Sequence, residues 1–181
     1  MKKLIAFVLF FYCSFCFSQE KTEEKKYKEI PSGYREISLG MGFEEVKAAL
    51  KEDSTFGFKG ERDISLLPTQ NRIVIETLGA LHIKRAWFQF YEEKLYVIII
   101  QMDTDKIDYY SVYSALTEKY GEPALLDPKR SIWKSENVSL TLERPLTVKY
   151  IDLKVFNELL GKSKTDKNFN NIMREDFIND F

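Results

Sequence analysis

The strongest pattern of apolar and polar positions is a pair of β-rich runs over residues 83–102, IKRAWFQFYEEKLYVIIIQM. The second run, residues 95–100, is apolar at every position and rich in β-branched residues, which predicts a strand covered on both faces and central to a sheet. A buried helix is the alternative, but the run is short for one. The charged break Glu92-Glu93-Lys94 predicts the turn of a hairpin. The first run alternates, which predicts one strand face made of Ile83, Arg85, Trp87 and Gln89 and another made of Lys84, Ala86, Phe88 and Phe90.

Two segments have a helical period instead. From Phe43 onwards, Val46 and Leu50 fall on the same helical face, and this helix is predicted to end near residues 51–53. A second helix is predicted over residues 108–120, started by Asp105 or Asp108 as cap and ended by Gly121 and Pro123. Its apolar face consists of Tyr109, Val112, Tyr113, Leu116 and Tyr120.

Shorter runs complete the chain. Strands are predicted around Ile37 and Leu39, Phe56 and Phe58, Ile64 and Leu66, and over residues 72–77, 131–134, 138–143 and 146–151, with a last helix over 152–160 ended by Gly161. Consecutive strands joined by short turns pair antiparallel. The predicted class is therefore α+β: an antiparallel meander with two to three helices on one face, whose order suggests a duplicated helix-then-strands unit.

The amino-terminal residues resemble an export signal. Lys2 and Lys3 precede an apolar stretch over residues 4–17, and small residues favour a cut before Gln19. As a helix this stretch would span roughly 21 Å, less than the roughly 30 Å of a bilayer core, so we favour a cleaved signal peptide (1–18) over a membrane anchor. A lipid anchor through Cys16 is not expected, because Phe15 precedes it where a small residue is usual.

Removal of the signal changes the composition of the mature chain. Both cysteines are lost with it, so the mature protein has neither thiols nor disulfides. The signal contains two of the 27 basic residues and none of the 28 acidic ones, so the mature net charge is 25 − 28 = −3, which argues against nucleic acid as a partner. We expect a flexible charged linker over 19–33, one α+β domain over 34–161, and a polar, partly helical tail over 162–181 in which Phe169, Ile172, Met173 and Phe177 form a weak apolar face.

Several catalytic chemistries lack their residues. His82 is the single histidine, and its position at the start of a predicted strand favours a structural role. No serine lies in a G-x-S-x-G motif, and the eight glycines form no phosphate-binding loop. Three carboxylate pairs, Glu44 with Glu45, Glu92 with Glu93 and Asp103 with Asp105, are interpreted as surface groups rather than catalytic or calcium-binding ones. We predict no catalytic, metal or cofactor residues.

Exposed aromatic residues are the remaining candidates, because they combine apolar area with a polar group and suit protein interfaces. The candidate interaction surface consists of Tyr110, Arg85, Trp87, Tyr91 and Tyr96.

The segment Leu39-Gly40-Met41-Gly42-Phe43-Glu44-Glu45-Val46 resembles the G-M-[ST]-x-x-x-V opening of SmpA/OmlA-type envelope proteins and related β-lactamase-inhibitor-like folds. Tyr120-Gly121-Glu122-Pro123, followed by Trp133 and a meander, resembles the second element of such a unit. Gly42 stands where Ser or Thr caps the helix in that pattern. The resemblance implies two helices packed on an antiparallel sheet, and a scaffold or protein-binding role in the cell envelope.

We therefore expect an exported protein, periplasmic or secreted, without a transmembrane span after signal removal, that binds an envelope protein and is not an enzyme. Two alternatives stay open. One is a carrier or sensor of a small ligand held between sheet and helices, and the other is a hydrolase that uses only carboxylates.

Overall fold

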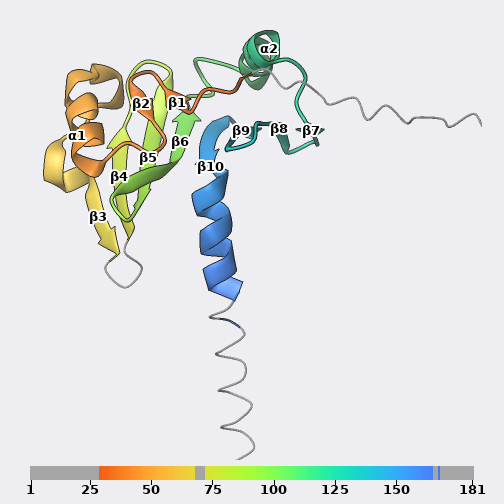
Figure 1. Ribbon diagram of the computed structural model, residues 1–181. Coiled ribbons are helices and arrows are strands. Elements are labelled where there is room, and N and C mark those ends of the chain that lie inside the picture. Colours follow the sequence, from red (N-terminus) through yellow and green to blue (C-terminus); the bar gives the residue numbers. More distant parts are fainter. Residues whose placement is uncertain (1–28, 68–71, 165–166, 168–181) are drawn as a thin grey trace, which may run out of the picture.

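The computed structural model describes residues 29–67, 72–164 and 167. The expected signal peptide, most of the linker and the tail beyond residue 167 lie outside these residues. The chain from Ile64 to Asp152 forms an eight-stranded antiparallel sheet in the order β3-β4-β5-β6-β10-β9-β8-β7 (Figure 1). The strand bounds are β3 Ile64–Leu67, β4 Arg72–Leu78, β5 Ile83–Tyr91, β6 Lys94–Met102, β7 Leu125–Leu126, β8 Arg130–Lys134, β9 Val138–Glu143 and β10 Thr147–Asp152.

The strand order shows that the sheet is built from two similar halves. Each half is a helix followed by a four-stranded meander: α1 (Phe43–Glu52) precedes β3 to β6, and α2 (Tyr109–Tyr120) precedes β7 to β10. The last strands of the two meanders, β6 and β10, pair with each other at the centre of the sheet, with Ile98 opposite Tyr150. The helix-then-strands repeat suggested by the sequence is therefore present in the topology.

One row of apolar side chains crosses the sheet from β3 to β8 and forms its core. Paired residues of neighbouring antiparallel strands lie on the same face. The pairings therefore align Ile64, Ile75, Phe88, Ile98, Tyr150, Leu140 and Trp133. Phe88, Ile98 and Leu140 are fully buried.

Both helices cover this apolar face. Phe43 of α1 meets Phe90 of β5 edge to face, with ring centroids 5.3 Å apart. Tyr113 of α2 lies 6.0 Å from Trp133 of β8. The indole N–H of Trp133 donates to the carbonyl of Gly121 at 2.7 Å, which fixes the end of α2 against the sheet.

Local capping explains where these helices begin. The Asp108 carboxylate accepts from the Ser111 backbone N–H at 2.9 Å, so Asp108 caps α2 as one of the two expected candidates. At α1 the cap is Gly42, which has no side chain to offer, and the Glu45 carboxylate accepts from the Gly42 N–H at 2.6 Å. Glu45, the third residue of the helix, thus makes one half of a capping box by satisfying the N–H of Gly42, whereas Gly42 has no side chain with which to make the other half.

The ends of the domain differ from the expected bounds. Ile30, inside the segment interpreted as a linker, is 6% exposed and belongs to the core. It leads into a small hairpin of β1 (Gly33–Tyr34) and β2 (Ile37–Ser38). At the other end a helix over residues 153–164, called the C-terminal helix below, continues from β10 and projects beyond the sheet (Figure 1). Gly161 lies within this helix and does not end it.

Two local predictions were wrong, and a third holds only in part. The segment with Phe56 and Phe58 is not a strand: Ser54–Phe56 and Gly60–Asp63 are 3-10 helices, η1 and η2. Ile83 is buried in the core although Arg85 is exposed, because an irregularity between them shifts the register with β6. The prediction that residues 95–100 are covered on both faces holds except at Ile99, which is half-buried. Among the described residues, no helix is both long and apolar enough to cross a membrane.

Candidate functional site

The sheet has a second face, opposite α1 and α2, which we call the open face. Its central row, read from the strand pairings, consists of Glu76, Trp87, Ile99, Lys149, Thr141, Ile132 and Leu125. Both helices contact the opposite face. The C-terminal helix reaches the open face at one end, and Lys59, Arg62 and Asp63 lie beside its residues Ser65, Glu76 and Leu78 on β3 and β4. The open face is therefore a surface of the sheet on which another molecule could lie.

Four of the five residues expected to form an interaction surface come together here. Arg85, Trp87 and Tyr91 alternate along β5 and point to the open face. Tyr96 lies beside them on β6, where its hydroxyl donates to the Gln89 side chain at 3.3 Å. Tyr110 is separate: it is 74% exposed on α2, on the other side of the sheet.

Arg85 and Trp87 form the outer part of this surface. The Arg85 guanidinium donates to the Glu76 carboxylate at 2.6 Å, and its Cζ lies 5.8 Å from the centroid of the Trp87 ring. Both charged side chains of this ion pair are 44% exposed. Water competes for such a pair, so we assign it a role in orienting Arg85 over the indole rather than in stabilising the fold.

The side chains of Tyr91 and Tyr96 are less accessible to a partner than those of Arg85 and Trp87. Lys162 of the C-terminal helix donates to the Tyr91 hydroxyl at 2.7 Å and lies over its ring at 5.1 Å. Hydrogen bonds to Glu158 and Tyr91 raise the pKa of Lys162. Tyr96 is 4% exposed, and its burial raises the pKa of its hydroxyl. Tyr96 therefore supports the surface from below and is not itself available to a partner.

The sequence did not identify the other half of the open face. Lys149 of β10 pairs with Glu143 of β9, and Ile132 and Lys134 continue the surface on β8. The alternation within each strand was visible in the sequence, but the pairing of β6 with β10 was not. That pairing places these residues beside Trp87.

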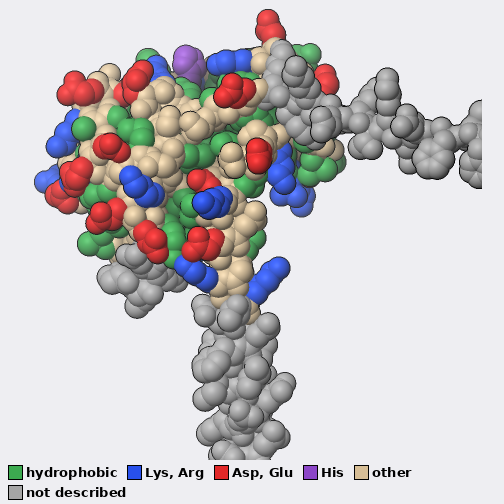
Figure 2. Space-filling model, viewed as in Figure 1, with side chains coloured by type: hydrophobic (Ala, Val, Ile, Leu, Met, Phe, Trp, Pro, Cys, Tyr) green, Lys and Arg blue, Asp and Glu red, His purple; other side chains and the backbone are tan. Residues whose placement is uncertain are grey.

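The charge of the open face differs from that of the chain. Six basic residues and two acidic ones point to it, a net charge of +4, whereas the whole chain has a net charge of −1. The basic residues are Arg72, Arg85, Lys94, Arg130, Lys134 and Lys149, and the acidic ones are Glu76 and Glu143. By contrast, acidic and basic side chains are interspersed over the side of the molecule shown in Figure 2.

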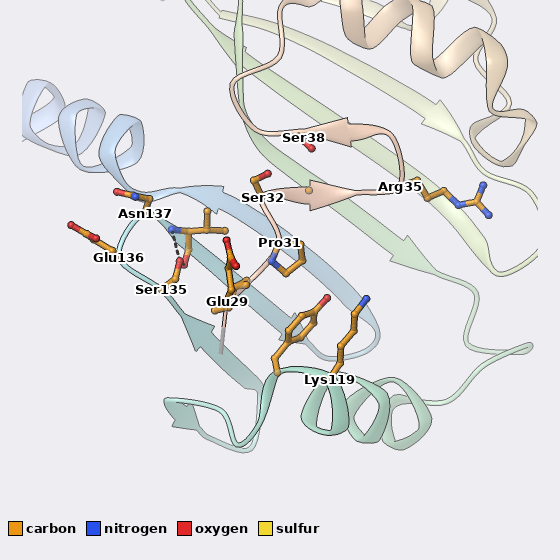
Figure 3. Close-up of a pocket in the computed structure, with 13 residues that line it drawn as sticks. Glu29, Pro31, Ser32, Arg35, Ser38, Lys119, Ser135, Glu136 and Asn137 are labelled. Atoms are coloured by element: carbon orange, nitrogen blue, oxygen red, sulfur yellow. Dashed lines mark hydrogen bonds between the residues drawn. The ribbon is translucent and has the colours of Figure 1, made fainter. Parts of the chain in front are cut away.

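A groove of about 780 Å³ lies elsewhere, between the β1–β2 hairpin, the end of α2 and the turn from β8 to β9 (Figure 3). Its charged side chains have both signs: Glu29 and Glu136 are acidic, and Arg35 and Lys119 are basic. Arg35 is engaged with the Asp53 carboxylate at 3.0 Å. Burial would raise the pKa of Asp53, but hydrogen bonds from Thr55 and Arg35 hold it below its usual value.

The carboxylate pairs occupy ordinary structural positions. Glu44 and Glu45 lie in the first turn of α1, and Glu92 and Glu93 form the tip of the β5–β6 hairpin with φ of 49° and 61°. Asp103 accepts from Lys106, mainly through a side-chain hydrogen bond that lowers its pKa. His82 is exposed in the turn before β5. In the part of the chain that the structure describes, no three metal-ligating side chains gather in one place.

Comparison with known proteins places the chain in a family. Searches of curated proteins and of solved structures found no significant match. A family profile for the TP0088 domain matches residues 32–162, which include both meanders and nearly all of the C-terminal helix described above. This match covers well over half of the sequence, and the chain therefore belongs to the TP0088 domain family.

Proposed function

We propose that this protein is an exported, non-catalytic module that binds another protein of the cell envelope through the open face of its sheet. The observation that carries the proposal is the open face itself, a half-exposed surface on which Trp87, Ile99 and Ile132 alternate with basic side chains. Aromatic and arginine side chains at the centre of such a surface are typical of protein interfaces.

The export part of the proposal rests on the amino-terminal sequence, with its two lysines and apolar stretch. The non-catalytic part rests on the residue types: one histidine, exposed in a turn, and carboxylate pairs in caps and turns. The resemblance to SmpA/OmlA-type proteins points in the same direction, although a shared fold does not by itself transfer a function.

The net charge of the open face narrows the partner to a protein with an acidic surface. A positive face meeting a negative one accelerates association and disfavours partners of the wrong charge. A mixed surface of this kind also disfavours a purely apolar partner, because Lys134 has no ion pair among the described residues and burying it without an acidic neighbour would be costly.

Photocrosslinking in the native cell tests this proposal. A crosslinking amino acid replaces Ile132 on the open face, and in a matched control it replaces Lys51, which is exposed on α1. We expect the Ile132 position to crosslink one envelope protein that the Lys51 position does not. The purified partner should then bind wild type and lose at least about tenfold in affinity to Trp87→Ala. Identical crosslinks from both positions, or unchanged affinity, would contradict the proposal.

The groove of Figure 3 supports a second candidate, a small-ligand carrier, because its volume of about 780 Å³ is in the range of ligand sites. It lies beside the β1–β2 hairpin and not in the expected position between sheet and helices. A thermal-shift screen distinguishes the two candidates. A ligand whose stabilisation is lost in Lys119→Ala but kept in Trp87→Ala would favour the carrier.

A further inference from the structure

The open face specifies the chemistry of what binds it. Its net charge of +4 requires acidic side chains, and Trp87, Ile99 and Ile132 between the charges require apolar ones. Lys134 has no ion pair among the described residues, and Nε of Arg72 is buried without a hydrogen-bond partner there. A short segment in which carboxylates alternate with large apolar side chains would satisfy both requirements.

The chain contains such a segment. Residues 174–181 read REDFINDF, with three acidic residues, one basic residue, two phenylalanines and one isoleucine. The preceding residues 162–170, KSKTDKNFN, contain three basic residues and one acidic one, so a net negative charge begins only beyond them. The match to the open face is therefore specific to residues 174–181.

The described structure brings this segment within reach. Lys162 near the end of the C-terminal helix already contacts Tyr91, which lies on the open face. Lys167 is still helical, so only the six residues 168–173 are counted as a connection, which can span up to about 20 Å when extended, and residues 174–181 can themselves cover up to about 26 Å. From β5 to β8 the sheet is four strand spacings wide, or about 19 Å. The segment can thus reach any part of the open face from Tyr91.

We propose that residues 174–181 bind the open face of their own domain, with Glu175, Asp176 and Asp180 opposite its basic side chains and Phe177 and Phe181 against Trp87 and Ile132. This interaction uses the same surface as the proposed function but does not depend on a partner. When a partner is present, it competes with residues 174–181 for the open face and must displace them to bind.

The two tryptophans provide a direct readout. Trp133 is 2% exposed and packed under α2, so it reports little of what happens on the open face. Trp87 is half-buried on the open face. Acrylamide quenching of tryptophan fluorescence in the purified full-length protein therefore measures whether Trp87 is covered, and acrylamide is neutral, so charge changes do not bias it.

We expect Phe177→Ala with Phe181→Ala to raise the quenching constant about twofold, because one of two tryptophans becomes accessible. The matched control is Tyr110→Ala, which removes an aromatic side chain that is 74% exposed on the far side of the sheet and should leave quenching unchanged. Quenching of the double variant equal to wild type would overturn the proposal.

Charge reversal tests the orientation of the segment. Lys134→Glu alone should raise quenching, and combining it with Asp176→Lys should restore the wild-type value, whereas Lys51→Glu on α1 should have no effect. Quenching that is independent of protein concentration over about 100-fold supports binding within one chain. Protection that appears only at high concentration would show that a second copy provides the segment, and would overturn the proposal as stated. These measurements need no partner, so their failure leaves the crosslinking test of the proposed function unaffected.

Discussion

The two faces of the sheet have similar strands but opposite chemistry. On the helix-covered face, neighbouring strands contribute side chains such as Phe88, Ile98 and Leu140, all fully buried. On the open face, the residues one position along, Trp87, Ile99 and Thr141, alternate with lysine, arginine and glutamate. The first face holds the fold together through continuous apolar burial. The second is covered only in part by the described residues, since Trp87 and Ile99 are half-buried although Thr141 is buried, so substitutions on the two faces should have different consequences.

Aspartate substitutions at neighbouring positions of β6 give the largest expected contrast. Ile98→Asp places a charge in the fully buried row and should prevent folding. Ile99→Asp points to the half-exposed open face and should cost only about 1–2 kcal/mol. Circular dichroism and thermal melting measure both. Equal losses would mean that the open face is as essential to the core as the helix-covered one.

Substitutions of the two tryptophans should show the same difference between the faces, with smaller changes in the free energy of unfolding. Trp133→Phe removes the hydrogen bond to Gly121 and leaves a gap under α2, which should cost about 2–3 kcal/mol. Trp87→Phe should change the free energy of unfolding by less than about 1 kcal/mol, because the indole is half-exposed. Urea unfolding checks both values. A larger loss for Trp87→Phe would show that the indole contributes to the fold as strongly as a core side chain.

Lowering the pH should destabilise α2, which is capped by Asp108, before it affects the buried apolar side chains of the sheet. Hydrogen bonds from the Ser111 hydroxyl and backbone N–H lower the pKa of Asp108 in the folded state. A carboxyl whose pKa falls on folding stabilises the protein above its unfolded value of about 3.9, and this contribution is lost as the pH falls through the folded value. Asp108→Asn should therefore lower the melting temperature at pH 7 but have less effect at pH 3. Asp105→Asn, in the loop before α2, is the control, and equal effects at both pH values would exclude the carboxylate as the cause.

The smallest effect is expected for the ion pair on the open face. Glu76→Gln breaks the 2.6 Å contact with Arg85, but both side chains are 44% exposed, so the loss should stay below about 1 kcal/mol. Thermal unfolding at low and at high salt measures it. A larger loss, independent of salt, would indicate that the pair is shielded from water.

The elements could be predicted from the sequence where the local pattern and the packing agree. The β5–β6 hairpin, the central position of β6 and the cap of α2 at Asp108 are confirmed, because alternation, β-branched runs and capping residues are local signals. The α+β class and the two-halved order of helix and strands are confirmed as well. Phe56 was placed wrongly, since a lone aromatic in a polar segment can enter the core from a 3-10 turn as well as from a strand.

The candidate surface could be predicted only in part. Arg85, Trp87 and Tyr91 share a face because of alternation within one strand, which the sequence shows directly. Lys149, Thr141 and Ile132 join them only through the pairing of β6 with β10, which are far apart in the chain and carry no local signal of their partnership. Tyr96 was expected at the surface, but the irregular pairing beside Gln89 leaves it buried. Whether any of these residues binds a partner stays a prediction.

The same pairing has a consequence for how the chain is made. Until residues 147–152 have been synthesised, β6 has a neighbour on one side only, and its run of Val97 to Ile100 presents an unpaired apolar edge. Such edges recruit strands from other molecules. A chain interrupted after β9 would therefore be prone to aggregation although most of its sheet is complete.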